Sequence, residues 1–291
     1  MKLLQPLQNA LADLLHELKD TDIKLIVGGG FGIYLKSAYV REQKLMTLLE
    51  IWPVSRSTND IDLFLRPELL IASNKAKQLA EAITQLGYSP IPGAENYQFA
   101  KSGIGVNGSG TVKLDILTGP EAAFEESGLK ADARRVKPNP SVGLHAHPVN
   151  EVPTLEHNLT PCVVSGDLSQ GGEWQGDVFL PHPFSFSMMK LFAFRDRIED
   201  RSKDYGSYHA LDLYSIIATT TEEEFKTASA LRTRFADNAF VIETGQIVSQ
   251  LFASKNALGV IRLRESPYFD ERFQLDKFVS VLSELFPTAQ K

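Results

Sequence analysis

Three aspartates on two predicted strands have the spacing to act together in catalysis. Asp60 and Asp62 lie in the short run DIDLFL, where side chains alternate and both carboxylates therefore share one face. Two like charges at neighbouring same-face positions repel each other unless a cation lies between them. Oxygen ligands of this kind suit magnesium bound together with substrate phosphates. For this pair alone, a solvated strand face with incidental acids is the alternative interpretation.

Asp115 lies in a second apolar run, VKLDIL, and points opposite to its apolar neighbours. If this strand pairs beside the Asp60 strand, Asp115 joins the same cluster. Three carboxylates can hold two metal ions about 3.5–4 Å apart, the arrangement that serves phosphoryl and nucleotidyl transfer. One ion would activate the attacking oxygen, and the other would neutralise charge on the triphosphate. Taken alone, Asp115 is an ordinary residue of a polar strand face.

A glycine run, Gly28-Gly29-Gly30, separates a predicted buried strand over 23–27 from a predicted helix. Glycines there permit positive φ angles and a close approach of the backbone, and the free N–H groups at a helix start can bind an anion. A tight strand-to-helix turn without a ligand is the alternative. The run lacks the Lys-Ser/Thr of a P-loop and the spacing of a GxGxxG motif, so it favours neither a P-loop kinase nor a Rossmann dehydrogenase.

In combination, these motifs resemble the polymerase-β-like nucleotidyltransferase superfamily. More narrowly, the chain resembles the AbiEii/AbiGii family of nucleotidyltransferase toxins, found in abortive-infection and toxin–antitoxin systems. The resemblance extends over about residues 23–217. The residues that carry it are Gly28, Gly29, Arg56, Thr58, Asp60, Asp62, Asp115, Lys190 and the run Asp212-Leu213-Tyr214.

The resemblance implies a role for each of these positions. Asp60, Asp62 and Asp115 would be metal ligands, with Asp115 also activating the attacking hydroxyl. Asp212 would orient basic groups; we favour it over Asp204 for this role because Leu-Tyr follows it. The expected nucleotide-binding residues are Gly28, Gly29, Arg56, Thr58, Lys190 and Arg195. The cofactor would be Mg2+ in a two-metal site, with Mn2+ as a substitute, and the substrate a nucleoside triphosphate.

Basic residues follow Lys190 at helical spacing. On a helix over 185–200 and beyond, Arg197 and Arg201 would fall within about 20° of Lys190. An inward-facing arginine needs an anionic partner, which Asp212 or Asp204 could supply. A solvated face is the alternative for these arginines.

Composition sets the broad class of the protein. The chain has 291 residues, 30 basic and 36 acidic, with a net charge of −6. This acidity argues against a protein that coats nucleic acid, but it leaves room for a local basic groove. The single cysteine, Cys162, excludes an internal disulfide framework and fits the cytoplasm. We expect an amphipathic first helix in place of a signal peptide, no membrane-spanning helix and no membrane partner.

The expected fold is α/β (α+β). A nucleotidyltransferase domain over 1–181, with a mixed sheet flanked by helices, precedes a helical C-terminal domain over 182–291. Strands are predicted over 23–27, 60–65, 96–100 and 111–119, and a helix over 72–86. The C-terminal helices are predicted over 185–200, 208–220, 223–236, 242–253 and 276–286. Residues 34–53 would form an inserted helix or lid.

The function expected from the sequence is metal-dependent transfer of a nucleoside monophosphate to an acceptor hydroxyl. The leading acceptor is the 3′ end of tRNA, with the protein acting as the toxin of a toxin–antitoxin or abortive-infection system beside a cognate antitoxin. Three alternatives remain. They are transfer to a small molecule such as an aminoglycoside, transfer to a protein hydroxyl, and a catalytically silent binding module on the same fold.

Overall fold

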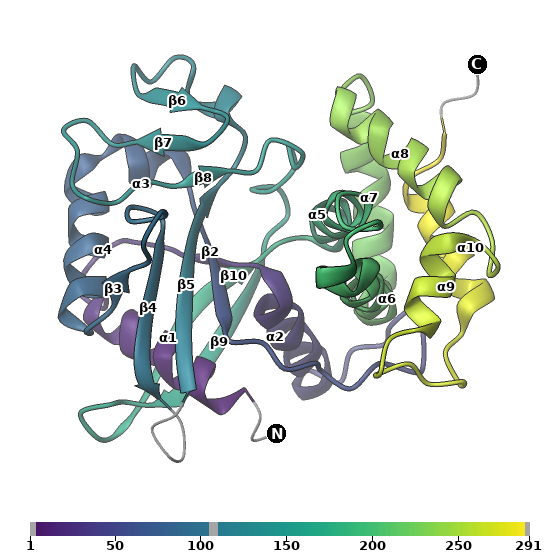
Figure 1. Cartoon of the computed structure of the whole chain (residues 1–291), viewed down its shortest axis with the longest axis horizontal. Helices are drawn as coiled ribbons and strands as arrows, with labels where there is room; N and C mark the ends of the chain where they lie inside the picture. The colour runs from purple at the N-terminus through teal and green to yellow at the C-terminus, as the bar shows by residue number, and fades with distance from the viewer. Residues whose placement is uncertain (1–3, 105–109, 289–291) are drawn as a thin grey trace. The chain divides into compact units, whose positions relative to one another are not determined.

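The computed structural model describes residues 4–104 and 110–288. The chain divides into two compact units (Figure 1). Unit 1 comprises Met1–Leu35, Ser57–Asn150 and Leu159–Leu180, and unit 2 comprises Lys36–Arg56, Glu151–Asn158 and Pro181–Lys291. The predicted fold class, a mixed α/β arrangement followed by a helical C-terminal region, is confirmed. The division at residue 181 stays a prediction.

Unit 1 is built on a mixed sheet with the strand order β3-β4-β5-β2-β1-β10-β9 and with β8 paired to β5. Strand β2 runs parallel to β5, and β1 runs parallel to β10. The other pairs among β1–β5, β9 and β10 are antiparallel. The strands are β1 (Ile26–Val27), β2 (Asp60–Leu65), β3 (Ser89–Pro90), β4 (Gln98–Ile104), β5 (Gly110–Thr118), β8 (His147–Pro148), β9 (Thr160–Asp167) and β10 (Glu173–Leu180).

Helices and a small hairpin complete unit 1. Helix α1 packs against β9 and β10, and α4 follows the short helix α3. A separate two-stranded sheet forms between β5 and β8 in the chain, within the stretch 119–160 that the sequence marks as loop-rich. The elements are α1 (Gln5–Glu17), α3 (Pro67–Ile71), α4 (Ser73–Gln85), η1 (Glu121–Phe124), β6 (Lys130–Asp132) and β7 (Arg135–Lys137), together with the start of α2 (Gly29–Glu42), whose residues from Lys36 onward belong to unit 2.

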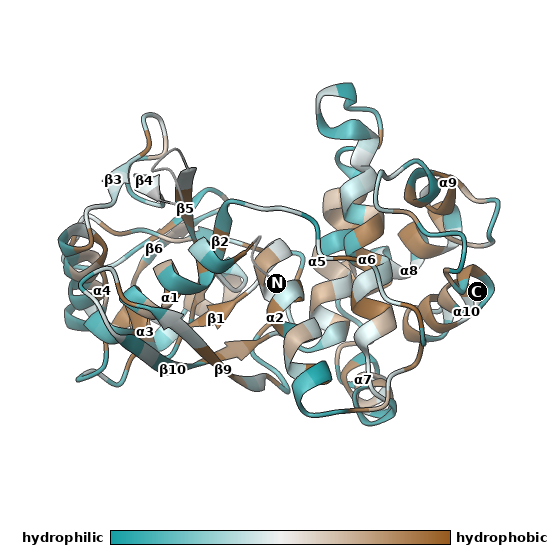
Figure 2. Cartoon of the chain, turned by 90° about the horizontal axis from the view of Figure 1, so that it is seen from below, coloured by the Kyte–Doolittle hydropathy of each residue, from teal (hydrophilic) through white to brown (hydrophobic). Residues whose placement is uncertain are grey.

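Apolar residues gather in the interior of each unit. In β2, the side chains of Ile61 and Leu63 are fully buried, as expected for the face opposite the two aspartates. Figure 2 shows β1, which lies between β2 and β10 in the sheet, and α10 of unit 2 largely in brown, the colour of apolar residues. In the part of the chain that the structure describes, no helix has both the length and the apolar character needed to cross a membrane.

Unit 2 is helical. Ring contacts between its helices and loops form the core, such as Tyr214 stacked on Phe273 at 4.3 Å and Phe184 on Phe286 at 4.6 Å between ring centroids. The elements are α5 (Pro183–Arg195), η2 (Arg201–Gly206), α6 (Ser207–Thr219), α7 (Glu222–Arg234), α8 (Ala239–Leu251), α9 (Leu258–Arg264) and α10 (Leu275–Leu285).

The helix predicted over 185–200 ends early, at Arg195. Asp204, Tyr205 and Gly206 then take left-handed backbone angles, with φ of 49°, 49° and 77°. A Cβ at Gly206 would lie 3.0 Å from the ring of Phe194, so glycine is what lets the start of α6 approach α5. The helical-wheel prediction for Arg197 and Arg201 is therefore wrong, because both residues lie beyond the end of the helix that carries Lys190.

Residues 34–53 do not form a separate inserted helix. Helix α2 continues to Glu42, and the chain then runs without a helix as far as β2. Within unit 2, the Trp52 indole donates a hydrogen bond to the Leu49 carbonyl at 2.9 Å. The Tyr214 hydroxyl donates one to the Ile51 carbonyl at 3.2 Å. These contacts hold the segment against α6.

His182, at the start of α5, makes unit 2 sensitive to acid. Its Nδ1 accepts a hydrogen bond from the Phe184 N–H at 3.1 Å, and its side chain is 2% exposed. Burial lowers the pKa of His182 to about 4, below the value of about 6.5 in an unfolded chain. The unfolded state therefore binds a proton first. The free energy of unfolding of unit 2 should therefore be highest above pH 6.5, and it should fall by about 3 kcal/mol as the pH is lowered toward 4.

Urea unfolding at a series of pH values tests this, followed by Trp52 fluorescence in a Trp174→Phe background. The His182→Asn variant keeps a capping side chain but loses the titrating group. We expect its stability to vary less between pH 6.5 and 4. An equally steep loss in the variant would contradict the assignment to His182.

Candidate active site

The carboxylates predicted to act together lie on two adjacent strands. Asp62 on β2 is directly opposite Asp115 on β5, and Asp60 is opposite Lys113, one step earlier along the same parallel pair. Because side chains alternate along each strand, these four residues project from one face of the sheet. The strand pairing that the three-carboxylate hypothesis requires is thus present.

The carboxylates of the acidic cluster repel one another. Burial, together with the charges of Asp62 and Asp60, raises the pKa of Asp115 to about 6. The nearest counter-charge to Asp60 is the Lys113 ammonium, 3.9 Å from Asp60 Oδ1. Asp60 Oδ1 and Asp115 Oδ1 are buried and have no hydrogen-bond partner among the described residues. Such a cluster is suited to bind a cation.

The carboxylates of this cluster fit a magnesium ion that is bound together with substrate phosphates. Among the residues that the structure describes, no group of three His, Cys, Asp or Glu side chains is arranged to hold a metal ion. Magnesium, however, is usually bound by one or two carboxylates together with substrate phosphates, and seldom by a cage made of protein alone. The facing carboxylates of Asp62 and Asp115, one with a buried oxygen that lacks a partner, fit an ion that arrives with its nucleotide.

The glycine turn between β1 and α2 lies in close contact with β2, the strand that carries Asp60 and Asp62. Gly29 has the positive φ that the sequence predicted, +62°. A Cβ at Gly29 would lie 1.5 Å from Asp62 Oδ2, and a Cβ at Gly28 would lie 2.3 Å from the ring of Phe64. Any side chain at either position would displace β2 residues. The turn and the β2 acids therefore form one structural element.

Sequence reasoning missed two polar neighbours of the carboxylates. Gln98 on β4 lies directly opposite Asp115, and its side chain hydrogen-bonds the Asp115 carboxylate. Lys113 could have been found, since it precedes Asp115 by two residues and so shares its face. Gln98 could not have been predicted from the sequence, because its position opposite Asp115 depends on the register of the β4–β5 hairpin. Thr58, predicted to bind nucleotide, accepts a weak hydrogen bond from the Asp60 N–H at 3.4 Å.

We expect Gln98→Ala to weaken Mn2+ binding about tenfold, because partners that orient a metal-ligating carboxylate contribute this much to affinity. The affinity for Mn2+ can be measured by electron paramagnetic resonance in the presence of a non-hydrolysable nucleoside triphosphate. Gln175→Ala, on the exposed side of β10, is the matched control and should change nothing. Equal affinity in the wild type and in Gln98→Ala would show that Gln98 does not position Asp115.

A second cluster, in unit 2, unites three of the predicted residues. Asp212 on α6 is 3% exposed, and both its oxygens accept hydrogen bonds from Arg56, each at 2.9 Å. The Lys190 ammonium is 2.8 Å from Asp212 Oδ2. Burial alone would raise the pKa of the Asp212 carboxyl, but the charges of Lys190 and Arg56 hold it well below its usual range. Asp212 is therefore ionised at all ordinary pH values.

Positive charge is in excess around this cluster. Arg197 donates a hydrogen bond to His209 Nε2 at 2.8 Å, and a guanidinium can only donate, so the His209 proton is on Nδ1. Burial lowers the pKa of His209 to about 3, which leaves it neutral. Of the charged groups that act on its pKa, three are positive (Arg56, Lys190 and Arg197) and one, Asp212, is negative. The cluster can therefore attract an anion.

Two other predicted residues lie elsewhere in unit 2. Arg195 forms ion pairs with Glu243, at 2.5 Å, and with Asp196, at 2.8 Å, and does not join the basic cluster. Asp204 is exposed in the turn before α6. The structure thus brings Asp212 to Lys190, as the sequence favoured.

Comparison with known proteins gives little further information. No family model matches the chain, and no curated protein matches it either. Among solved structures, the solution structure of the antibiotic-resistance factor ANT(2'')-Ia is similar, with a TM-score of 0.35 and 12% sequence identity. The similarity covers 81% of this chain and 96% of that chain.

Proposed function

We propose that this protein is a metal-dependent nucleotidyltransferase that moves a nucleoside monophosphate from a nucleoside triphosphate to an acceptor hydroxyl. The observation that carries the proposal is the facing pair Asp62 and Asp115 across two parallel strands, with Asp60 one step away. Burial and the charges of Asp62 and Asp60 raise the pKa of Asp115, and Gly29 leaves room for the Asp62 carboxylate. Carboxylates arranged in this way are suited to bind the magnesium ion of a magnesium–triphosphate complex.

In the proposed reaction, an acceptor oxygen attacks the α-phosphorus. The new O–P bond forms as the bond between the α-phosphorus and the bridging oxygen breaks, and pyrophosphate leaves with the electron pair. Bound magnesium would neutralise charge on the phosphates. Asp60 and Asp62 would hold the ion that accompanies the triphosphate, and the Asp115 carboxylate would accept the proton of the attacking hydroxyl. Gln98 holds Asp115 in position for this transfer.

The basic cluster of unit 2 has a separate role in the proposal. We assign Lys190 and Arg56 to an anionic group of the substrate, with Asp212 keeping both side chains in a fixed orientation. The excess of positive charge around His209 supports this assignment. Arg195 has no role in it, because its charge is taken up by Glu243 and Asp196.

For the acceptor we propose the 3′ end of tRNA, with the protein acting as a toxin whose antitoxin is encoded nearby. The support is the sequence resemblance described above, through its glycine, Asp-x-Asp and Lys…Asp-Leu-Tyr motifs. A small molecule or a protein hydroxyl would use the same carboxylates, and the experiment separates these acceptors.

The test is incubation of the purified protein with total tRNA, magnesium and each of four α-labelled nucleoside triphosphates. Label in tRNA with one nucleotide would establish both the acceptor and the base preference. Pyrophosphate release that depends on an aminoglycoside or a protein, without labelled tRNA, would retain nucleotidyl transfer and overturn the tRNA acceptor. No pyrophosphate with any of these acceptors would contradict the proposed activity.

A further inference from the structure

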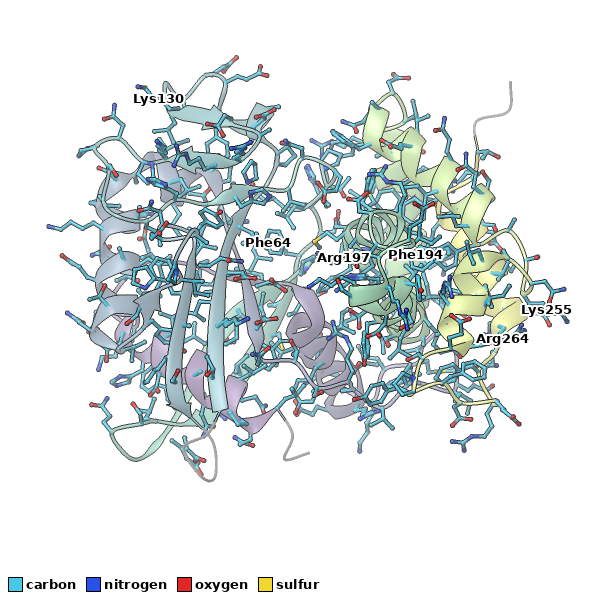
Figure 3. The ribbon with its side chains drawn as sticks, in the orientation of Figure 1. Phe64, Lys130, Phe194, Arg197, Lys255 and Arg264 are labelled. Atoms are coloured by element: carbon cyan, nitrogen blue, oxygen red, sulfur yellow. The ribbon has the colours of Figure 1, made fainter. Side chains whose placement is uncertain are left out.

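The hairpin β6–β7 is a concentrated basic surface on an acidic protein. Residues 130–137 contain Lys130, Arg134, Arg135 and Lys137 against a single acid, Asp132, for a net charge of 4 − 1 = +3, whereas the whole chain carries −6. Lys130, Arg134 and Arg135 are exposed, and Lys137 is half-buried. Figure 1 shows the hairpin at one end of unit 1, and in Figure 3 Lys130 extends away from the sheet.

The protein does not neutralise these charges. Within the described parts of the chain, none of the four basic side chains lies in an ion pair, and the exposed Glu125 and Glu126 that precede the hairpin form none with it. Asp132 is engaged in the turn, where its Oδ1 accepts hydrogen bonds from the Arg134 N–H at 2.9 Å and the Arg135 N–H at 3.1 Å. The positive charge therefore faces solvent.

The two lysines of the hairpin lie directly opposite each other. Lys130 and Lys137 are cross-strand partners, as are Asp132 and Arg135, so these side chains share one face of the hairpin. Like charges directly opposite each other destabilise a strand pair, and a two-stranded hairpin is marginal to begin with. Asp132 lies on the same face and interacts electrostatically with Arg135 and Lys137, and an anion bound between the lysines would reduce the remaining repulsion.

The opposite face of the hairpin holds it to unit 1. Val136 is fully buried, and its backbone N–H and carbonyl both bond to Ala146, at 2.8 and 3.1 Å. The basic face is thereby presented on a supported strand pair. No large apolar side chain of residues 130–137 is exposed, which disfavours insertion into a lipid surface.

We propose that the basic face of β6–β7 binds the phosphodiester backbone of an RNA chain. Lysine and arginine contacts to phosphates supply sequence-independent affinity and set the orientation of the nucleic acid. Because the whole chain carries a net charge of −6, this locally positive face would steer the approach of RNA. The choice of RNA rests on the proposed function, in which the acceptor is an RNA. The charge pattern itself does not depend on that function.

The experiment measures the binding of a fluorescein-labelled RNA stem-loop to the full chain by anisotropy, across about 50 to 200 mM salt. The hairpin variant carries Lys130→Gln, Arg134→Gln, Arg135→Gln and Lys137→Gln. We expect the affinity for RNA to fall at least tenfold. The plot of the logarithm of the binding constant against the logarithm of salt concentration should become less steep, with the magnitude of its slope lower by about 3. The control variant neutralises four exposed lysines elsewhere (Lys77→Gln, Lys226→Gln, Lys255→Gln and Lys277→Gln) and should bind RNA like the wild type.

Four results would overturn the inference: unchanged affinity in the hairpin variant, an equal loss in the control, no binding of RNA by the wild type, and stronger binding to anionic vesicles than to RNA. Circular dichroism of each variant shows that its fold is intact. Asp62→Asn separates this inference from the proposed function, because it should bind RNA normally. RNA bound through the hairpin without nucleotide transfer would overturn the proposed function alone, and transfer with unchanged RNA affinity in the hairpin variant would overturn this inference alone.

Discussion

Replacing Asp62 with asparagine should lower nucleotide transfer about a thousandfold while leaving unit 1 at least as stable as in the wild type. The loss of activity follows because Asp62 is a proposed metal ligand and faces Asp115, the proposed proton acceptor. The gain in stability follows because burial and the like charges of Asp62 and Asp60 together raise the pKa of Asp115. Removing one of these charges relieves the repulsion, and the pKa of Asp115 should fall.

Activity is measured as pyrophosphate release, and stability by urea unfolding with Trp174 as the probe for unit 1 in a Trp52→Phe background. Asp177→Asn removes an exposed strand acid from the same sheet and serves as the control, with both properties expected to be unchanged. Full activity of Asp62→Asn would eliminate Asp62 as a ligand. Strong destabilisation with lost activity would instead indicate a structural role.

Replacing Asp212 with asparagine should destabilise unit 2 by about 3–5 kcal/mol. The carboxylate is the shared partner of Lys190, whose side chain is 9% exposed, and of Arg56. Without it, both cations stay in a poorly solvated setting with their counter-charge lost, and the more deeply buried Lys190 suffers most. Adding Lys190→Met to Asp212→Asn should therefore recover part of the stability.

Trp52 fluorescence in a Trp174→Phe background follows the unfolding of unit 2 for these variants. The matched control is Asp270→Asn, which breaks the ion pair between Asp270 and Arg272 (Nη2 to Oδ2, 2.6 Å), in which the arginine side chain is 75% exposed. We expect little change there, because solvent screens exposed pairs. Equal losses in Asp212→Asn and Asp270→Asn would refute the special role of the buried cluster.

Local features of the site could be predicted from the sequence. Alternation along a strand was enough to predict that Asp60 and Asp62 share a face opposite Ile61 and Leu63, because side-chain direction in a strand has a period of two residues. The glycine turn was equally readable, and Gly29 has the expected positive φ. Helical periodicity also predicted the helical C-terminal region, since apolar spacing is a property of neighbouring residues.

Which of these local features lie next to each other depends on the packing of segments that are far apart in the chain. Arg56 and Asp212 are 156 residues apart, and no local pattern indicates their bidentate pair. Gln98 reaches Asp115 because the β4–β5 register shifts near Gly103, and part of the connecting Gly-rich run, residues 105–109, lies outside the described residues. The end of α5 at Arg195 depends on how closely Gly206 approaches Phe194. Register, helix ends and buried ion pairs are set by the packing of distant segments, and the alternation of nearby residues does not encode them.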